Sequence, residues 1–110
     1  MVELAVEGDS RMAQPITSAD GVFQIVRHSI VYPPMGPKSV QGAVKNTSAD
    51  NANVEIKVDF YDASETLLGS TVGVFKDIKP GETRLFDIWG ERLPNMYEVE
   101  DYKIAYVKKV

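Results

Sequence analysis

The sequence predicts an all-β fold, a sandwich or a small barrel, for a single domain of 110 residues. Runs rich in Val, Ile, Phe and Tyr recur along the chain, and several alternate apolar and polar residues as half-buried strands do. Clusters of Gly, Pro, Asn, Asp and Ser recur about every 8–12 residues and separate these runs. The pattern therefore indicates about six or seven short strands.

The first part of the chain lacks this patterning. Residues 1–20 hold several turn formers and show no sustained period, so we expect a lead-in or linker there and a domain over residues 21–110. Within the lead-in, Leu4 and Val6 can form a short edge strand.

The first two strands are expected at Val22–Tyr32 and Ser39–Asn46. The loop 33–37 between them contains three prolines, which exclude a helix or a central strand. Residues 46–53 are rich in Asn, Ser, Thr and Asp, and this composition predicts a turn. The lone Gly42 inside the second strand predicts a point where another strand or an aromatic ring comes close.

The clearest strand is Val54–Tyr61, where apolar and polar residues alternate throughout. Its inward side chains are expected to be Val54, Ile56, Val58 and Phe60. The next strand is Thr66–Phe75, with Gly69 and Gly73 as bulges or points of close approach. Thr71–Phe75 carries no charge, so this segment can pair with a neighbouring strand if it lies at a sheet edge.

The last two strands are expected at Thr83–Trp89 and Tyr102–Val107. In the strand Thr83–Trp89, one face is expected to carry Arg84, Phe86 and Ile88. The second sets Tyr102, Ile104 and Tyr106 against Lys103, Ala105 and Val107. A helical turn fits only within Ile88–Met96, where Gly90 and Pro94 limit its length.

Composition and charge exclude several classes of protein. Sixteen acidic residues outnumber twelve basic ones, and the net charge of −4 disfavours nucleic acid as a partner. No apolar run approaches the ~18 residues of a membrane span. Glu3, Glu7 and Asp9 stand where a signal peptide would have its positive and apolar parts. Without cysteine the chain can form neither disulfides nor thiolate metal sites.

The titratable residues do not indicate catalysis. His28 is the sole histidine and lies in an apolar strand, where we expect a packing or surface role. The chain has no P-loop, dinucleotide fingerprint or Gly-x-Ser-x-Gly elbow. We therefore predict that the protein is not an enzyme and has no cofactor. A weak alternative is a calcium site at one of two turns. Its candidate ligands are Asp59, Asp62 and Glu65 at one turn, and Asp50, Asn51 and Asn53 at the other.

Four aromatic residues are the candidate binding residues. Tyr61 points outward from its strand and Trp89 ends another, while Tyr97 and Tyr102 follow closely in the sequence. Partly exposed aromatic side chains can form a platform for sugars or anchor a protein partner. The alternative is that Trp89, Tyr102 and Tyr106 pack in the core or at the rim of a sheet.

Segments between residues 22 and 107 resemble the FxLYD family. They are Val40–Thr47 (VQGAVKNT), Val58–Asp62 (VDFYD), Leu68–Gly69 and Ile78–Thr83 (IKPGET), together with Phe86. Val58 and Phe60 replace the usual Phe and Leu but keep apolar side chains at inward positions. Asn46 is expected to hydrogen-bond the backbone where its strand ends, and Pro80-Gly81 to form a type II turn. Similar spacing occurs in other sandwich families, including the water-stress LEA-type domains.

The resemblance implies an immunoglobulin-like β-sandwich of about seven antiparallel strands of Greek-key type. It also implies a module of a bacterial or archaeal cell-envelope or secreted protein. We accordingly expect a non-catalytic spacer or docking surface for protein or carbohydrate, monomeric or weakly homo-oligomeric. The alternative is a free-standing intracellular protein that binds a small apolar ligand between its sheets.

Overall fold

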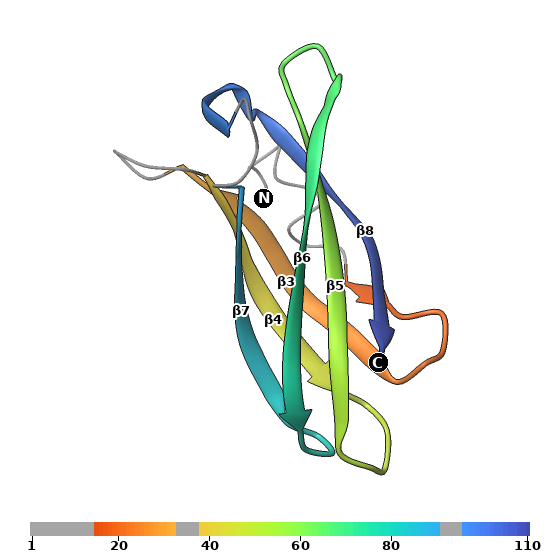
Figure 1. Ribbon diagram of the computed structural model, residues 1–110. Coiled ribbons are helices and arrows are strands. Elements are labelled where there is room, and N and C mark those ends of the chain that lie inside the picture. The colour runs from red at the N-terminus through yellow and green to blue at the C-terminus, as the bar shows by residue number, and fades with distance from the viewer. Residues whose placement is uncertain (1–14, 33–37, 91–95) are drawn as a thin grey trace, which may run out of the picture.

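The computed structural model describes residues 15–32, 38–90 and 96–110. Within them seven strands form two antiparallel sheets that face each other (Figure 1), so the predicted all-β fold is confirmed. The first sheet has the order β2-β3-β4-β7, with β2 (Ile16–Thr17), β3 (Phe23–Val31), β4 (Ser39–Asn46) and β7 (Thr83–Trp89). The second has the order β6-β5-β8, with β6 (Leu67–Ile78), β5 (Ala52–Tyr61) and β8 (Asp101–Lys109).

Helical structure in the described residues is limited to η2 (Met96–Glu98), a single 3-10 turn before β8. None of this part of the chain forms a helix long and apolar enough to cross a membrane. The expected helical turn within Ile88–Met96 falls mostly on residues 91–95, outside the described residues. The same holds for the loop 33–37 and for Leu4 and Val6.

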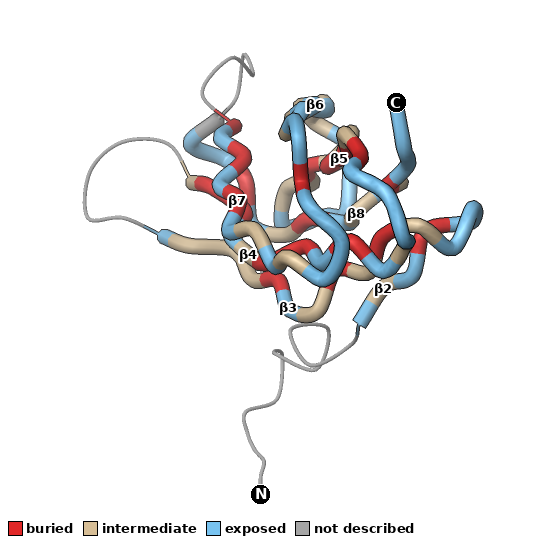
Figure 2. The backbone as a smooth tube through the Cα atoms, turned by 90° about the horizontal axis from the view of Figure 1, so that it is seen from below, coloured by how far each residue is buried: buried red, intermediate tan, exposed pale blue. Residues whose placement is uncertain are grey.

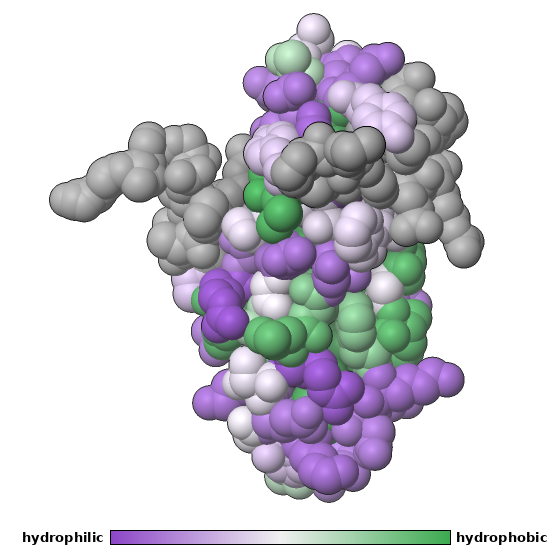
Figure 3. All heavy atoms as spheres, turned by 90° about the vertical axis from the view of Figure 1, so that its left-hand side faces the viewer, coloured by the Kyte–Doolittle hydropathy of each residue, from purple (hydrophilic) through white to green (hydrophobic). Residues whose placement is uncertain are grey.

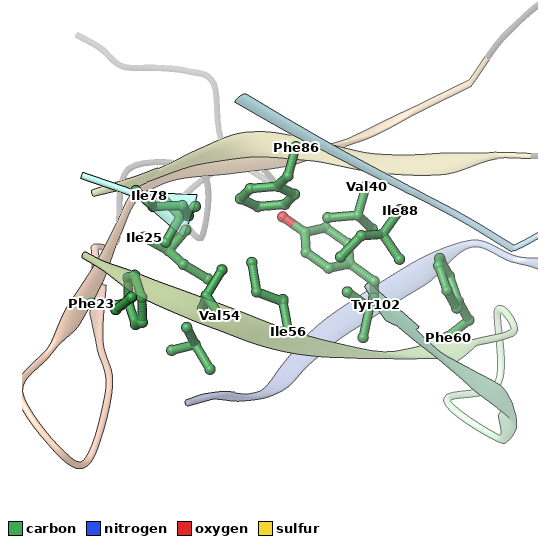
Figure 4. Packing of buried hydrophobic residues seen from close by; sticks show 14 of the residues in the cluster. Phe23, Ile25, Val40, Val54, Ile56, Phe60, Ile78, Phe86, Ile88 and Tyr102 are labelled. Carbon is green, nitrogen blue, oxygen red and sulfur yellow. The ribbon is translucent and has the colours of Figure 1, made fainter. Parts of the chain in front are cut away.

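One hydrophobic core lies between the two sheets. The predicted alternation of β5 is confirmed, because its four inward side chains are completely buried: Val54, Ile56, Val58 and Phe60. Figure 4 shows Val54, Ile56 and Phe60 meeting side chains from the other sheet, which include Phe23, Ile25, Val40, Phe86 and Ile88. Figure 2 shows buried and exposed residues interspersed along the strands around this core. Full burial of one such side chain contributes roughly 1.5–3 kcal/mol to stability.

In strand β8, the predicted alternation of side chains between the two faces is wrong. Tyr102 and Val107 are both buried, although an unbroken period of 2 would place them on opposite faces. The register shifts where Lys57 pairs with Tyr106 and Val58 pairs with Ile104, so β8 has one extra residue there. This bulge reverses the faces along β8, and Tyr106 points outward instead, where its hydroxyl donates a 2.5 Å hydrogen bond to Glu55.

Gly42 lies at the predicted point of close approach. It pairs with Phe86 of β7 and with His28 of β3. A β-carbon at this position would lie 2.7 Å from Cζ of the Phe86 ring and 2.3 Å from the backbone oxygen of Arg27. The backbone of β4 therefore has no room for a side chain at this point in the core.

Asn46 is completely buried at the end of β4, where it joins the β4–β5 loop to the end of β6 and the turn that follows it. Its side-chain NH₂ donates 2.8 Å hydrogen bonds to the backbone oxygens of both Asp50 and Ile78. Its side-chain oxygen accepts bonds from the backbone N–H and the hydroxyl of Ser48. The backbone oxygen of Asn46 also accepts a 2.8 Å bond from the N–H of Gly81. Each polar group of this buried amide is thus paired, as burial requires.

The edge of the first sheet begins inside the expected lead-in. Ile16 and Thr17 pair with Ile25 and Gln24 of β3. The turn that follows is closed by Asp20, whose carboxylate accepts hydrogen bonds from the Ser18 hydroxyl and from a backbone N–H; these bonds hold its pKa below the ordinary range. Ile16 and Thr17 therefore form the edge strand of this sheet, and residues 18–20 form the turn that leads into β3.

Candidate functional site

Three exposed aromatic residues belong to segments that meet one end of the sandwich, the upper end in Figure 1. There β3 and β7 end, β4 and β8 begin, and η2 lies between the sheets' ends. The exposed aromatic residues here are Tyr32 (51% exposed), Trp89 (41%) and Tyr97 (69%). We call these three residues the aromatic end.

Lys38 connects the parts of this end. Its ammonium lies 5.0 Å from the centre of the Tyr32 ring and 3.5 Å from the carboxylate of Glu100, and it also donates to the backbone oxygen of Val99. The Tyr32 hydroxyl donates a 3.1 Å bond to the backbone oxygen of Glu100. Because Lys38 directly precedes the residue that pairs with Trp89, these contacts link the end of the first sheet to the start of β8.

This arrangement suits the recognition of a partner. Trp and Tyr present large apolar faces with one polar tip, which makes them frequent anchors in interfaces. The ammonium of Lys38 and the carboxylate of Glu100 supply the polar rim that such interfaces have. The aromatic end can therefore supply both the apolar contact and the orienting charges of a docking site.

The four predicted binding residues do not lie together. Trp89 and Tyr97 belong to the aromatic end. Tyr61 lies on the outer face of β5, half-buried, with the ammonium of Lys103 5.2 Å from its ring centre. Tyr102 is a core residue with an exposed fraction of 2%, so the platform expected from the sequence does not include it.

Sequence reasoning missed Tyr32 and Lys38. Both flank the loop 33–37, and their partnership with Glu100 depends on how the two sheets meet. A signal was present nonetheless: Tyr32 ends a strand immediately before a run of prolines, and such positions are exposed more often than strand interiors.

His28 has a structural role. It is 5% exposed and its ring meets the Tyr102 ring edge-on at a centroid distance of 5.7 Å. Its Nδ1 lies 2.6 Å from the Tyr102 hydroxyl, which joins β3 to β8 across the core. This is the packing role that the apolar surroundings of His28 in the sequence predicted.

The calcium candidates do not form a site. Asp62 uses one carboxylate oxygen to accept the backbone N–H groups of Ser64 and Thr66, both at 2.9 Å. The carboxylate of Asp59 instead accepts a bond from Ser70. Across the described ranges no three His, Cys, Asp or Glu side chains converge, so Asp59, Asp62 and Glu65 are not a joint ligand set.

The second group of candidate ligands holds loops together. Asn51 donates a 3.1 Å bond to the carboxylate of Asp77, and the side-chain oxygen of Asn53 accepts the backbone N–H of the same residue. Asp77 has φ = 58°, in the left-handed region, and these bonds hold it there. Asn51 and Asn53 therefore fix the end of β6, and a calcium role for the turn that they share with Asp50 has no support.

A hollow of about 320 Å³ lies in the first sheet. Its lining comes from β3, β4 and β7 alone: Arg27, His28, Ser29, Gln41, Gly42, Leu85 and Phe86. The second sheet contributes none of these residues, so the hollow is not a cavity between the sheets. This hollow is therefore not the cavity between the sheets that would be expected to bind a small apolar ligand.

Comparison with known proteins gives one relative. An uncharacterized protein of Methanocaldococcus jannaschii is 34% identical to this chain over 83 residues, which cover 74% of this chain. The chain spans 62% of that relative's length. No protein-family model matches the chain, and no solved structure matches it significantly.

Proposed function

We propose that this domain is a non-catalytic binding module of a larger cell-envelope or secreted protein. The aromatic end is its docking surface, and a protein is the partner that this surface fits best. The observations that carry the proposal are the exposure of Tyr32, Trp89 and Tyr97 on segments that meet this end of the sandwich, and the Lys38–Glu100 ion pair beside Tyr32. Anchors of this kind, surrounded by a polar rim, are typical of protein interfaces.

We further propose that the fold is an immunoglobulin-like Greek key related to the FxLYD domains. Two features of the topology support this. β7 pairs with β4 although β5 and β6 lie between them in the sequence, and β8 likewise returns to β5. The residues that carry the resemblance also have roles in the fold, since Gly42 admits the Phe86 ring and Asn46 joins the β4–β5 loop to the end of β6. The placement in an envelope protein rests on this kinship.

The absence of catalysis is part of the same proposal. The sole histidine is buried and engaged with Tyr102. A reactive site needs at least two titratable groups that converge in a cleft. The carboxylates of Asp59 and Asp62 instead bind neighbouring hydroxyl and backbone groups.

Removing two anchors should abolish docking but not folding. In the variant Trp89→Ala/Tyr97→Ala we expect the melting temperature to stay within about 5 °C of the wild type, because Tyr97 is largely exposed and Trp89 lies outside the buried core. Affinity for the partner should fall at least ~30-fold, as expected when two anchor residues are lost. The partner is captured from the envelope fraction with the immobilised domain, purified, and titrated calorimetrically; a glycan array runs in parallel.

The matched control is Leu85→Ala, which removes a 68% exposed apolar side chain from the same strand at a distance from the aromatic end. It should bind as the wild type does. Equal binding by the double variant would contradict the proposal, and unfolding of Trp89→Ala would show that this residue is structural. Capture by glycans alone would make the partner a carbohydrate.

The placement in a larger envelope protein has its own test. An antibody raised against the domain should detect, in fractionated cells that produce it, a band far above 12.2 kDa in the envelope fraction. A 12.2 kDa band in the cytosol would contradict the envelope placement and leave the small-ligand alternative to be screened.

A further inference from the structure

The strand β6 is an edge strand with an unusually apolar edge. It lies at the end of its sheet and pairs, within the described residues, with β5 alone. No residue from Thr66 to Phe75 is charged. Natural edge strands are usually blunted by charge or by short length. The other three edges follow this rule, because β8 carries Lys103 and Lys108, β7 carries Arg84 and Asp87, and β2 has only two residues.

The middle of β6 is regular and open. Gly69–Phe75 pairs residue by residue with Val54–Phe60, between two register shifts. Val72 and Val74 point outward and are 48% and 47% exposed. Figure 3, which faces the side where β7 lies at the edge of its sheet, shows apolar side chains across the middle of this surface.

The free edge of β6 is covered by another side chain only after Phe75. The guanidinium of Arg84 donates 3.3 Å bonds to the backbone oxygens of Lys76 and Asp77, which cover the last part of β6 from the side of β7. Glu82 holds this guanidinium through a 2.9 Å ion pair. The uncovered segment is therefore Gly69–Phe75.

We propose that a second copy of this chain pairs with β6 through this segment, antiparallel and about a two-fold axis at Gly73. In an antiparallel pair, directly opposite residues point to the same face of the sheet. For two copies of one strand related by a two-fold axis, the numbers of two opposite residues must therefore add up to an even number. Centring on Gly73 sets Val72 of each copy opposite Val74 of the other. The two three-stranded sheets then become one continuous sheet.

Gly73 suits the centre of this interface. On the inner side, a β-carbon at Gly73 would lie 3.1 Å from the Phe75 ring and 3.2 Å from the Ile88 side chain, so this position stays free of a side chain. On the outer side, the valine pairs bring together four β-branched side chains, which pack well across strands.

The side chains that flank the paired residues Thr71–Phe75 are also compatible in this register. Lys76 of each copy comes opposite Ser70 of the other. The hydroxyl of Ser70 donates a 2.5 Å bond to the carboxylate of Asp59 on the neighbouring strand. The lysine of the second copy thus meets a hydroxyl bound to an anion, and no like charges face each other.

The association is weak in solution. A single edge contact buries less than the roughly 1,200 Å² of a standard interface, so a dissociation constant of roughly 10 µM to 1 mM is expected. Domains held side by side on larger proteins experience high effective concentrations, under which such a contact forms.

Sedimentation velocity on the full chain tests the proposal. Between about 10 µM and 1 mM the wild type should shift from monomer to dimer. Val74→Lys should raise the dissociation constant at least ~30-fold and leave the melting temperature unchanged, because an edge lysine blocks pairing without disturbing the fold. Leu85→Lys, an equally drastic change at an exposed position on β7, should dimerise as the wild type does. A wild type that stays monomeric, or an undiminished Val74→Lys dimer, would overturn the proposal.

Cysteine cross-linking tests the register, since the chain has no cysteine of its own. Residues directly opposite in a sheet have Cα atoms about 4.5–5.5 Å apart, within disulfide range, whereas Val72 of both copies would lie about 8 Å apart. An oxidised mixture of the Val72→Cys and Val74→Cys proteins should therefore form disulfide dimers, and each protein alone should not. Efficient cross-linking of either one alone would refute the axis at Gly73. Trp89→Ala/Tyr97→Ala should dimerise normally, which separates this interface from the aromatic end.

Discussion

Gly42→Ala is expected to destabilise the domain by about 3 kcal/mol or more, at or above the upper end of the range for overpacked cores. The added methyl group would lie 2.3 Å from the backbone oxygen of Arg27 and 2.7 Å from the Phe86 ring. The aromatic ring can rotate or shift by a few tenths of an ångström. The backbone oxygen belongs to the adjacent strand of the ladder and cannot move without breaking it.

Urea denaturation measures this effect as a fall in midpoint with an unchanged m-value. Gly81→Ala is the matched control. It has φ = 77° but open space around the glycine, so it should cost only the roughly 1–2 kcal/mol of a left-handed residue. Adding Phe86→Leu to Gly42→Ala should recover only part of the loss, because the contact with the Arg27 oxygen remains. A Gly42→Ala protein as stable as the wild type would show that β4 can shift within its sheet.

Asn46→Asp should be comparably damaging, with an expected loss of about 3–5 kcal/mol. The substitution keeps the shape of the side chain but replaces its NH₂ by a second oxygen. The two backbone oxygens of Asp50 and Ile78, each 2.8 Å away, would then face an anion at a completely buried position. Both carbonyl groups would also lose their donor.

Thermal and urea unfolding give the size of this effect. The control is Ser48→Ala, which removes one 2.7 Å bond to the side-chain oxygen of Asn46 and leaves the donors in place. Its cost should be about 0.5–1.5 kcal/mol. If Asn46→Asp and Ser48→Ala are equally stable, the bonds to Asp50 and Ile78 do not hold the loops as inferred.

Local chemistry made much of this fold predictable. The alternation in β5 needs no information from elsewhere in the chain, because burial of one face dictates it. The turn at Pro80-Gly81 is equally local: the N–H of Glu82 bonds the oxygen of Lys79 at 2.9 Å and Gly81 has a positive φ, as a type II turn requires. A lone glycine in an apolar strand likewise indicated that something presses against it.

Features that depend on a partner strand were not predictable. The bulge in β8 arises from its pairing with β5, and nothing within Tyr102–Val107 marks the extra residue. Ile16–Thr17 is too short to show any period. The bond from Asn46 to Ile78 spans 32 positions, so only its local half, the turn with Ser48, was visible in the sequence.

In the candidate site, too, some features follow from the local sequence and others depend on which strands pair. Residue type identified Trp89 and Tyr97, since large amphipathic side chains at strand ends are natural anchors. Their position at the same end of the sandwich as Tyr32 depends on which strand ends meet, and that follows from strand order. Tyr102 illustrates the reverse case, because its burial is decided by the opposite sheet.

The pairing of β7 with β4 and of β8 with β5 has a consequence for how the chain acquires its structure. The β5–β6 hairpin is local and can form within microseconds, whereas closure through distant strands takes milliseconds to seconds. A chain emerging from the ribosome has completed β6 before residues 83–109 exist. For that interval the inward face of the hairpin lacks the two strands that will complete its core, so the nascent domain passes through an aggregation-prone stage that ends only when β8 is made.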